Sequence, residues 1–157
     1  MTRPQPETGR LEGRSHVLPV RVYYEDTDAG GIVYHANYLR FAERGRSDFL
    51  RLLGVHHREL AALPDGGLGL AVRSCTFDFI APARLDDALE VVTTMVALGG
   101  ATLEAEQIVR RDGADLVRGH VRIACIGGNG RPRRLPADMR RRLAPFCPSS
   151  NAPDDEA

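Results

Sequence analysis

The sequence predicts an α+β fold in which an antiparallel sheet packs around one long helix. In residues 36–53, apolar side chains recur at spacings of three and four, which is the period of an amphipathic helix. Farther along the chain, four segments alternate apolar and polar side chains, as half-buried strands do. Two of the connections between these segments carry Gly-Gly or Asp-Gly pairs, which favour tight hairpins over helical crossovers.

The first predicted element is a strand at residues 17–24, VLPVRVYY, because β-branched and aromatic side chains dominate it. The helix that follows would bury one side and expose the other. Its apolar stripe comprises Tyr38, Phe41, Ala42, Gly45, Phe49, Leu52 and Leu53. Its polar side carries Arg40, Glu43, Arg44, Ser47 and Arg51. Gly54, directly after the stripe, suits a helix C-terminus.

The four later strands are predicted at 68–80, 89–98, 103–110 and 116–126. Gly99-Gly100 and Asp112-Gly113 supply two hairpin turns. In the last strand, one face carries Val117, Val121, Ile123 and Cys125, and the other carries Arg118, His120 and Arg122. A short helix is predicted at 138–143. The chain has no GxGxxG motif and no alternating β-α units, which excludes a Rossmann fold.

Composition indicates one domain without an extended charged surface. The chain has 157 residues, of which 43% are hydrophobic, enough for one real core. We predict a flexible tail at 1–15, a single domain at 16–146 and a second flexible tail at 147–157, because both ends are polar. All 21 basic residues are arginine, and 21 acids balance them. The absence of lysine excludes a Schiff-base lysine and a P-loop, and the neutral charge argues against a nucleic-acid partner.

The compartment and the cysteines are also indicated by composition. The N-terminal residues lack the apolar stretch of a signal peptide, and no run approaches the ~18 apolar residues of a membrane helix. We therefore expect a cytoplasmic protein with no membrane span. Cys75, Cys125 and Cys147 match no zinc-ligand spacing. Cys75 and Cys125 lie inside apolar runs and are predicted to be buried core residues.

The segment at 23–38, YYEDTDAGGIVYHANY, carries the strongest chemical signal. Three acids, Glu25, Asp26 and Asp28, precede two glycines at the junction of the predicted strand and helix. A helix N-terminus offers unpaired N–H groups and a positive dipole end, which can hold an oxyanion that develops on a carbonyl. A carboxylate beside it can act as a nucleophile or as a general base. The segment therefore predicts an acyl-transfer site.

Three other interpretations of these residues stay open. An aspartate at such a junction often serves only as a turn former or a helix cap. Asp26 and Asp28 could together bind Mg²⁺, since oxygen donors suit hard cations, although no further acidic cluster completes the ligand set. His35 could act as a general base or have a purely structural role.

The string VRVYYEDTDAGGIVYHANYLRFAERGRSDFLR resembles the active-site signature of the 4-hydroxybenzoyl-CoA thioesterase superfamily, which has the hot-dog fold. It is most similar to the Tol–Pal-associated acyl-CoA thioesterase branch of Gram-negative bacteria. The resemblance continues through FDFIAPARLDDALEV at 77–91 and GRPRRLPA at 130–137, and it covers about residues 17 to 145. It implies a curled sheet around a long helix, which agrees with the fold class predicted from periodicity.

The resemblance also implies roles for individual residues. It assigns the catalytic carboxylate to Asp28, and the donor that polarises the thioester carbonyl to the backbone N–H of His35. Tyr34 and Val33 are near neighbours of that donor. The implied supporting residues are Glu25, Asp26, Gly30, Gly31, Asn37, Tyr38 and Glu43.

Among the supporting residues, Glu25 and Asp26 would orient the loop, and Asn37 and Tyr38 would brace it. Glu43 falls on the polar side of the predicted helix, as a secondary acid near the substrate. Many family members carry Pro after the catalytic Asp, where this chain has Ala29. This departure argues against an aryl-CoA substrate.

The implied reaction is hydrolysis of acyl-CoA to a free acid and CoA, without a metal ion or another cofactor. Asp28 would either attack the carbonyl to form a mixed anhydride or deprotonate water. The residues do not separate these two routes. Short aliphatic acyl-CoA is the first expectation for the substrate, and longer fatty acyl-CoA is the second.

Arginines suit the phosphates of CoA, because guanidinium and phosphate can share two parallel hydrogen bonds. The predicted substrate-binding residues are Arg84, Arg131, Arg133 and Arg134. Residues 131–142 hold six Arg and one Asp, so the neutral average conceals a local basic stretch. That stretch could also bind an acidic acyl carrier protein, or it could be an ordinary solvated face.

The resemblance further implies a homodimer, assembled into a homotetramer, with each active site at a subunit boundary. Two competing functions remain. One is a weakly catalytic module that binds acyl carrier protein or lipid-synthesis enzymes. The other is a hot-dog dehydratase, which would use a His with an acidic partner, but the D-x-A-G-G string favours a thioesterase.

Overall fold

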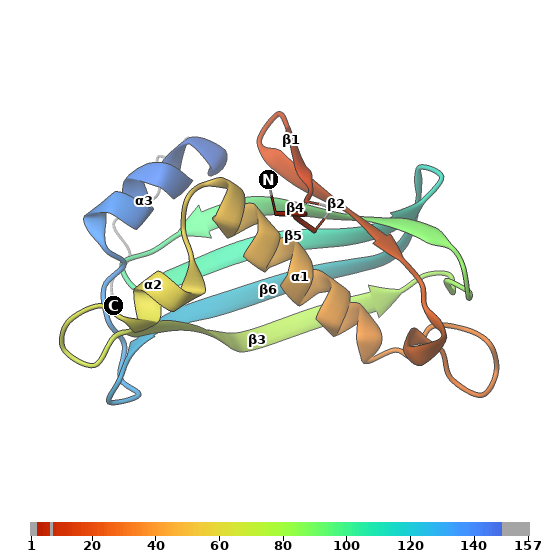
Figure 1. Cartoon of the computed structure of the whole chain (residues 1–157), viewed down its shortest axis with the longest axis horizontal. Coiled ribbons are helices and arrows are strands. Elements are labelled where there is room, and N and C mark those ends of the chain that lie inside the picture. Colours follow the sequence, from red (N-terminus) through yellow and green to blue (C-terminus); the bar gives the residue numbers. More distant parts are fainter. Residues whose placement is uncertain (1–2, 7, 149–157) are drawn as a thin grey trace.

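The computed structural model describes residues 3–6 and 8–148, and these contain one six-stranded antiparallel sheet of strand order β1-β2-β4-β5-β6-β3 (Figure 1). The strands are β1 (Arg10–Glu12), β2 (Ser15–Arg21), β3 (Leu68–Phe79), β4 (Ala88–Leu98), β5 (Thr102–Arg111) and β6 (Ala114–Gly127). The helices are α1 (Asn37–Leu52), α2 (His57–Ala61) and α3 (Ala137–Leu143), with 3-10 turns η1 (Tyr24–Asp26) and η2 (Ala144–Phe146). The predicted class, one long helix against an antiparallel sheet, is confirmed.

Helix α1 crosses one face of the sheet, and Gly45 sets how closely the two approach (Figure 1). A Cβ atom at Gly45 would lie 2.9 Å from Cγ1 of Val91 and 3.1 Å from Oγ1 of Thr93. Gln107 of β5 is buried at this contact, where its amide donates to the Ala42 carbonyl at 2.8 Å and to the Thr93 hydroxyl at 2.9 Å. A satisfied polar bridge therefore fixes the helix on the sheet.

Two apolar clusters fill the space between α1 and the sheet. The cluster around the first half of α1 includes Val22, Val33, Tyr38, Phe41, Val109 and Val117. The cluster around its second half includes Phe49, Leu60, Val121, Cys125 and Leu143. Phe77 of β3 packs against both. Because Val22 and Val33 flank the loop that precedes α1, the first cluster anchors that loop.

Several local predictions are wrong. Residues 10–12 form β1 and β2 begins at Ser15, so ordered structure begins inside the tail predicted at 1–15. The strand predicted at 17–24 ends at Arg21, because the chain turns into η1. Helix α2 was not predicted, since five residues are too few to display a helical period. Residues 1, 2 and 7, and the predicted C-terminal tail from 149 onward, lie outside the described residues.

The cysteine prediction is correct at one position and wrong at another. Cys125 is buried, whereas Cys75 is exposed. Cys75 lies on β3, the edge strand of the sheet, so its apolar sequence context does not translate into burial. Leu52, which was assigned to the apolar stripe of the helix, is likewise exposed near the end of α1.

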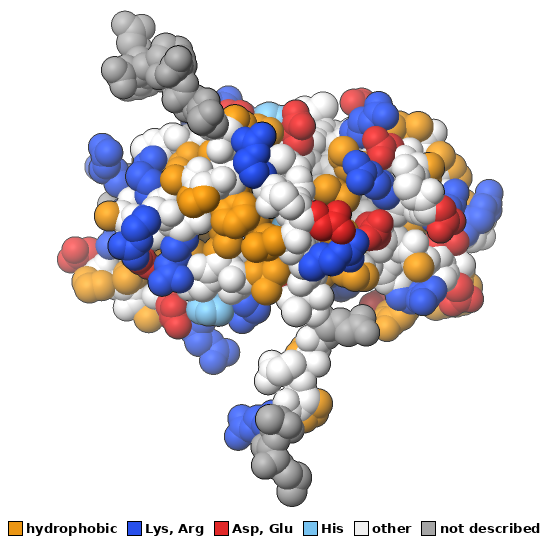
Figure 2. All heavy atoms as spheres, turned by 90° about the horizontal axis from the view of Figure 1, so that it is seen from above, with side chains coloured by type: hydrophobic (Ala, Val, Ile, Leu, Met, Phe, Trp, Pro, Cys, Tyr) orange, Lys and Arg blue, Asp and Glu red, His pale blue; other side chains and the backbone are white. Residues whose placement is uncertain are grey.

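The surface carries both signs of charge. Figure 2 shows arginine and acidic side chains interspersed with apolar ones on the face viewed there, in keeping with the neutral composition. None of the helices in the described part of the chain is long and apolar enough to cross a membrane.

Candidate active site

The loop between β2 and α1 folds into a short hairpin with Asp28 at its tip. Thr27 and Val33 form an isolated antiparallel bridge, and the Asp28 amide donates to the Ile32 carbonyl at 2.9 Å. The Gly31 amide closes the turn by donating to the Asp28 carbonyl at 3.1 Å. Gly31 has φ of +81°, which explains why glycine occupies this position.

The Asp28 carboxylate is exposed and lightly engaged. Its Oδ1 accepts a hydrogen bond from the Gly30 amide at 2.8 Å, and its Oδ2 has no partner among the described residues. A carboxylate held at one oxygen keeps lone pairs free at the other. Asp28 is therefore available to a substrate carbonyl or to a water molecule.

Asp26 is buried, and both of its carboxylate oxygens are occupied. Oδ1 accepts from the Asn37 side-chain amide at 2.9 Å, and Oδ2 accepts from the Tyr23 amide at 2.8 Å. With 5% exposure, this carboxylate ties the hairpin to the first turn of α1. Both oxygens of Asp26 are thus engaged by protein donors, and the described residues contain no cluster of three or more His, Cys, Asp or Glu side chains that could complete the alternative Mg²⁺ site.

Directly before α1, the backbone amides of His35 and Ala36 have no acceptor among the described residues. The Val33 amide donates to the Ala83 carbonyl, and the Tyr34 amide donates to the Asp26 carbonyl, both at 2.9 Å. No side chain caps this helix N-terminus. These free N–H groups therefore lie at the positive end of the α1 dipole.

Aromatic rings line the same end of the molecule. Tyr38 is buried, and its hydroxyl oxygen accepts from the Ala83 amide at 3.1 Å. Burial raises the pKa of the Tyr38 phenol, although the hydrogen bond from Ala83 opposes this. The ring of Phe79, at the end of β3, lies 5.7 Å from that of Tyr38 and 6.2 Å from that of His35. Glu25 and the Tyr34 side chain are exposed.

The predicted arginines fall in two separate places. Arg84 forms an isolated bridge with Ile32 of the hairpin and is exposed, so it lies beside the candidate site. The other three predicted residues, Arg131, Arg133 and Arg134, follow β6. Within this chain they lie near the C-terminal end of α1, whereas the Asp28 hairpin lies at its N-terminal end (Figure 1). Arg133 donates to the carbonyls of Pro64 and Gly67. Their prediction as part of one site with Asp28 is therefore not met within a single chain.

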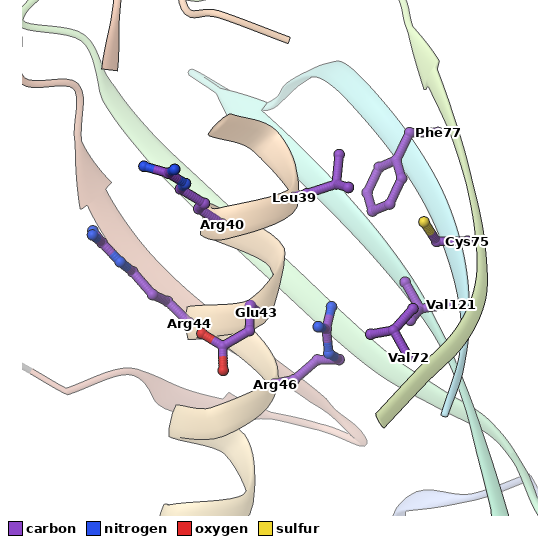
Figure 3. Close-up of a pocket in the computed structure, with 9 residues that line it drawn as sticks. All are labelled: Leu39, Arg40, Glu43, Arg44, Arg46, Val72, Cys75, Phe77 and Val121. Carbon is purple, nitrogen blue, oxygen red and sulfur yellow. The ribbon is translucent and has the colours of Figure 1, made fainter. Parts of the chain in front are cut away.

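A groove that sequence reasoning missed runs between α1 and the edge strand β3 (Figure 3). Its volume is about 490 Å³, within the range of small-molecule pockets. It is lined by Leu39, Arg40, Glu43, Arg44, Arg46, Val72, Cys75, Phe77 and Val121. Glu43 therefore belongs to a pocket wall. No sequence signal indicated that Arg46 and Cys75 would face each other, because the helix and strand periods do not reveal which strand forms the edge.

Comparison with known proteins identifies the family. A model of the thioesterase-like superfamily matches residues 22–143. The chain belongs to this superfamily. The acyl-CoA thioesterase YbgC of Haemophilus influenzae is 42% identical over 124 residues, which cover 78% of this chain and 90% of that protein. The acyl-CoA thioester hydrolase YbgC of Escherichia coli O6:H1 is 43% identical over 123 residues, or 77% and 90% of the two chains.

Solved structures agree with this membership. The crystal structure of a probable thioesterase from Bartonella henselae superposes with a TM-score of 0.75 at 43% identity, and the match covers 78% of this chain and 99% of that one. The family resemblance and the hot-dog fold predicted from the sequence are confirmed. The predicted enzyme class, a thioester hydrolase, is also the class in the names of both curated relatives.

Proposed function

We propose that this protein hydrolyses acyl-CoA thioesters to a free acid and CoA. The observation that carries the proposal is the exposed Asp28 carboxylate on the same short loop as the free His35 amide. Relatives named as acyl-CoA thioesterases match this chain over 90% of their own length. Both the geometry and the family therefore support acyl transfer to water.

In this reaction the thioester carbonyl oxygen accepts a hydrogen bond from the His35 N–H. The helix dipole and that donor stabilise the oxyanion as it develops. Asp28 either attacks the carbonyl carbon and releases CoA thiolate, after which water hydrolyses the mixed anhydride, or removes a proton from the attacking water. Asp26 and Asn37 hold the loop in place and do not contact the reacting atoms. The chemistry as proposed needs no metal ion or other cofactor.

The proposed catalytic unit is a homodimer, further assembled into a tetramer, joined along β3. This strand is the edge of the sheet, and Val72, Phe79 and the adjoining Ile80 are 48%, 51% and 52% exposed. An open, partly apolar edge strand is a natural pairing surface. A single monomeric species in light scattering would contradict this part of the proposal.

Antiparallel pairing of two β3 strands would also bring the distant arginines to the site. It sets the Leu68 end of one strand beside the Phe79 end of the other. The loop that carries Arg131 and Arg134 is tied to the Leu68 end, since Arg133 donates to the Gly67 carbonyl at 2.8 Å. These two exposed guanidinium groups would then reach CoA phosphates, or an acidic acyl carrier protein, at the partner's active site, where Arg84 already lies.

The preferred acyl group is proposed as a short aliphatic chain, with a longer fatty chain second. Mostly apolar groove walls support an aliphatic substrate. A cytoplasmic location agrees with an acyl-CoA substrate and with three unpaired cysteines.

The decisive test is thiol release from a series of acyl-CoA substrates by the wild type and by Asp28→Asn. We expect the variant to lose about 10²-fold or more in kcat, because the amide neither attacks nor accepts a proton. Asp112→Asn, at an exposed hairpin turn, is the matched control and should retain wild-type turnover. Near-normal turnover by Asp28→Asn would contradict the assignment. Tight binding to acyl carrier protein without turnover of any thioester would favour the binding-module alternative.

A further inference from the structure

Arg46 lies at one end of an otherwise largely apolar groove. Its side chain points from α1 toward β3, where Val72 and Val121 face it (Figure 3). At the other end, Leu39 points toward the ring of Phe77 (Figure 3). Seven residues separate Leu39 from Arg46, which is two helical turns or roughly 10 Å on one face of α1. The groove thus runs along α1 from Leu39, about one helical turn after His35, toward the Arg46 guanidinium.

The Arg46 guanidinium has spare hydrogen-bonding capacity. One of its five N–H donors is used, by NH1 to the Gln107 side-chain oxygen at 2.9 Å. No other acceptor and no ion-pair partner is found for it in residues 3–6 and 8–148. Burial lowers the pKa of Arg46, against the opposing charge of Glu43. A partly dehydrated cation with unused donors is a strong attractor for an oxygen ligand.

The acid nearest in sequence does not neutralise Arg46. The Glu43 carboxylate accepts from the Ser47 hydroxyl at 2.9 Å and forms no ion pair with Arg46. Arg40 and Arg44 also line the groove, and their side chains extend away from the β3 side (Figure 3). Three cations and one acid therefore give the groove a net positive charge, which complements an anionic occupant.

We propose that this groove is the acyl pocket and that Arg46 selects acyl groups with an oxygen acceptor, ideally a carboxylate, at the end distal to the thioester. The inference rests on the proposed thioester hydrolysis and adds a substrate class to it. Among aliphatic acyl-CoA esters of a given chain length, the preferred substrates are then the mono-CoA esters of dicarboxylic acids. Hydrolysis of the thioester bond in such an ester gives the dicarboxylic acid and CoA, as it gives a monocarboxylic acid and CoA for an unsubstituted acyl chain.

An acyl chain that ends in a methyl group should bind this pocket less favourably than one that ends in a carboxylate. Its methyl end would displace water from the Arg46 N–H groups without replacing the lost hydrogen bonds. Sites that hydrogen-bond a polar substrate group reject analogues that lack it far more strongly than apolar pockets reject a missing methylene. Because Val72, Phe77 and Val121 line the sheet side of the groove, the middle of the acyl chain is expected to be hydrocarbon.

The first experiment compares pairs of equal carbon number: glutaryl- with valeryl-CoA, adipyl- with hexanoyl-CoA and sebacyl- with decanoyl-CoA. For at least one pair, we expect kcat/KM to favour the dicarboxylic ester about tenfold or more. Arg46→Met should reduce that ratio toward one or reverse it, and Arg46→Lys should restore part of it. Arg51→Met, an exposed arginine outside the groove on the same helix, is the matched control and should keep the ratio.

The outcomes separate this inference from the proposed function. Hydrolysis of every ester with the same ratio in wild type and Arg46→Met would overturn the role of Arg46 and leave the thioesterase assignment intact. Hydrolysis of none would overturn the thioesterase assignment itself. Circular dichroism of each variant distinguishes a lost preference from a lost fold.

A second experiment reports on the groove without catalysis. Cys75 lines it, and it is exposed where Cys125 is buried and Cys147 is partly buried. Octanoate should slow the alkylation of Cys75 by iodoacetamide more than uncharged 1-octanol does, because the carboxylate binds Arg46. In Arg46→Met the two compounds should protect equally. Equal protection already in the wild type would contradict the inference, even if no thioester were hydrolysed.

Discussion

Nε2 of the fully buried His16 lies 2.7 Å from Oδ2 of Asp48, and this pair fastens the N-terminal hairpin to helix α1. Asp48 also accepts from the Gly9 amide at 2.8 Å and from the Thr8 hydroxyl at 2.9 Å. The His16 ring stacks on Phe49, with centroids 5.3 Å apart. Its Nδ1 is buried and has no partner in the described chain. Protonation of His16 would therefore bury an N–H without an acceptor.

This pair predicts that the protein loses stability in mild acid. Burial lowers the pKa of His16 below its ordinary 6.5, although Asp48 opposes this. Below about pH 6.5 the unfolded chain takes up a proton that the folded chain does not, so the free energy of unfolding decreases. Burial alone would raise the pKa of Asp48, but hydrogen bonds from Gly9, His16 and Thr8 lower it below 3.8. The stabilising contribution of the Asp48 carboxylate is fully present above pH 3.8 and is lost as the pH falls through its folded-state pKa. The Asp48 effect, like the His16 effect, therefore lowers stability in acid.

Thermal melts between pH 7.5 and 5 measure this effect. We expect the wild-type Tm to fall by a few degrees across the range, and His16→Phe to flatten the slope because no proton is taken up there. His120 is partly exposed and pairs with Glu104 at 3.4 Å. The control His120→Gln should keep the wild-type slope. An unchanged slope in His16→Phe would assign the acid sensitivity to other groups.

The proposed oxyanion donor predicts a contrast between two substitutions at His35. His35→Ala keeps the backbone N–H and should stay within about tenfold of wild-type kcat. His35→Pro removes that N–H and should lose about 10²- to 10³-fold, the usual effect of one oxyanion donor. Proline is tolerated at a helix start, and circular dichroism checks that α1 still forms. Equal rates for the two variants in a thiol-release assay would exclude this amide as the donor.

The bridge from Asp26 to Asn37 predicts a coupled loss of stability and activity. Asn37→Ala leaves a buried carboxylate oxygen without its 2.9 Å hydrogen bond, which should cost about 1–3 kcal/mol in urea unfolding. Because the same bond holds the loop against α1, kcat should fall as well. Asn129→Ala removes a side-chain bond to the Arg131 amide in an exposed turn. It should cost less than about 1 kcal/mol, and an equal cost for both would argue against the bracing role.

The elements that the sequence predicts well are those with a clear local periodicity. Helix α1 and strands β3 to β6 begin and end within two residues of their predicted limits, because apolar spacing and flanking turn residues mark them in the sequence, although β3 is largely exposed. Cys75 and Arg46 lay outside this reasoning. The exposure of Cys75 and the place of Arg46 in the groove depend on β3 being an edge strand, and the hairpin meander of β4, β5 and β6 does not reveal that β3 pairs with β6.

In the candidate site, too, the sequence predicts features within one continuous segment but not the contacts between segments distant in sequence. Asp28 and His35 were predicted from the sequence, because the family resemblance runs through the one continuous segment that carries both. The hydrogen bonds of Asp26, and the occupied amides of Val33 and Tyr34, depend on where Ala83 and Asn37 lie in space. The position of Arg133 depends on its bonds to the loop before β3. Contacts between segments distant in sequence are set by strand order, which periodicity leaves open.

The close contact at Gly45 predicts that adding one methyl group at this position would push helix α1 away from the sheet. Gly45→Ala should gain up to about 1 kcal/mol of helix propensity, but its Cβ would press on Val91, Thr93 and Gln107 at 2.9 to 3.3 Å. Overpacking of this kind costs about 1–3 kcal/mol, so urea unfolding should show a net loss of about 1–2 kcal/mol. Ser47→Ala, on the partly exposed side of α1, is the control for the clash: it adds helix propensity without overpacking and loses only exposed hydrogen bonds to Glu43 and His57. Because the helix must shift away from Gln107, Gly45→Ala should also loosen the Arg46 contact. A net gain in stability would mean that the sheet yields at this point and that the helix position is not fixed by Gly45.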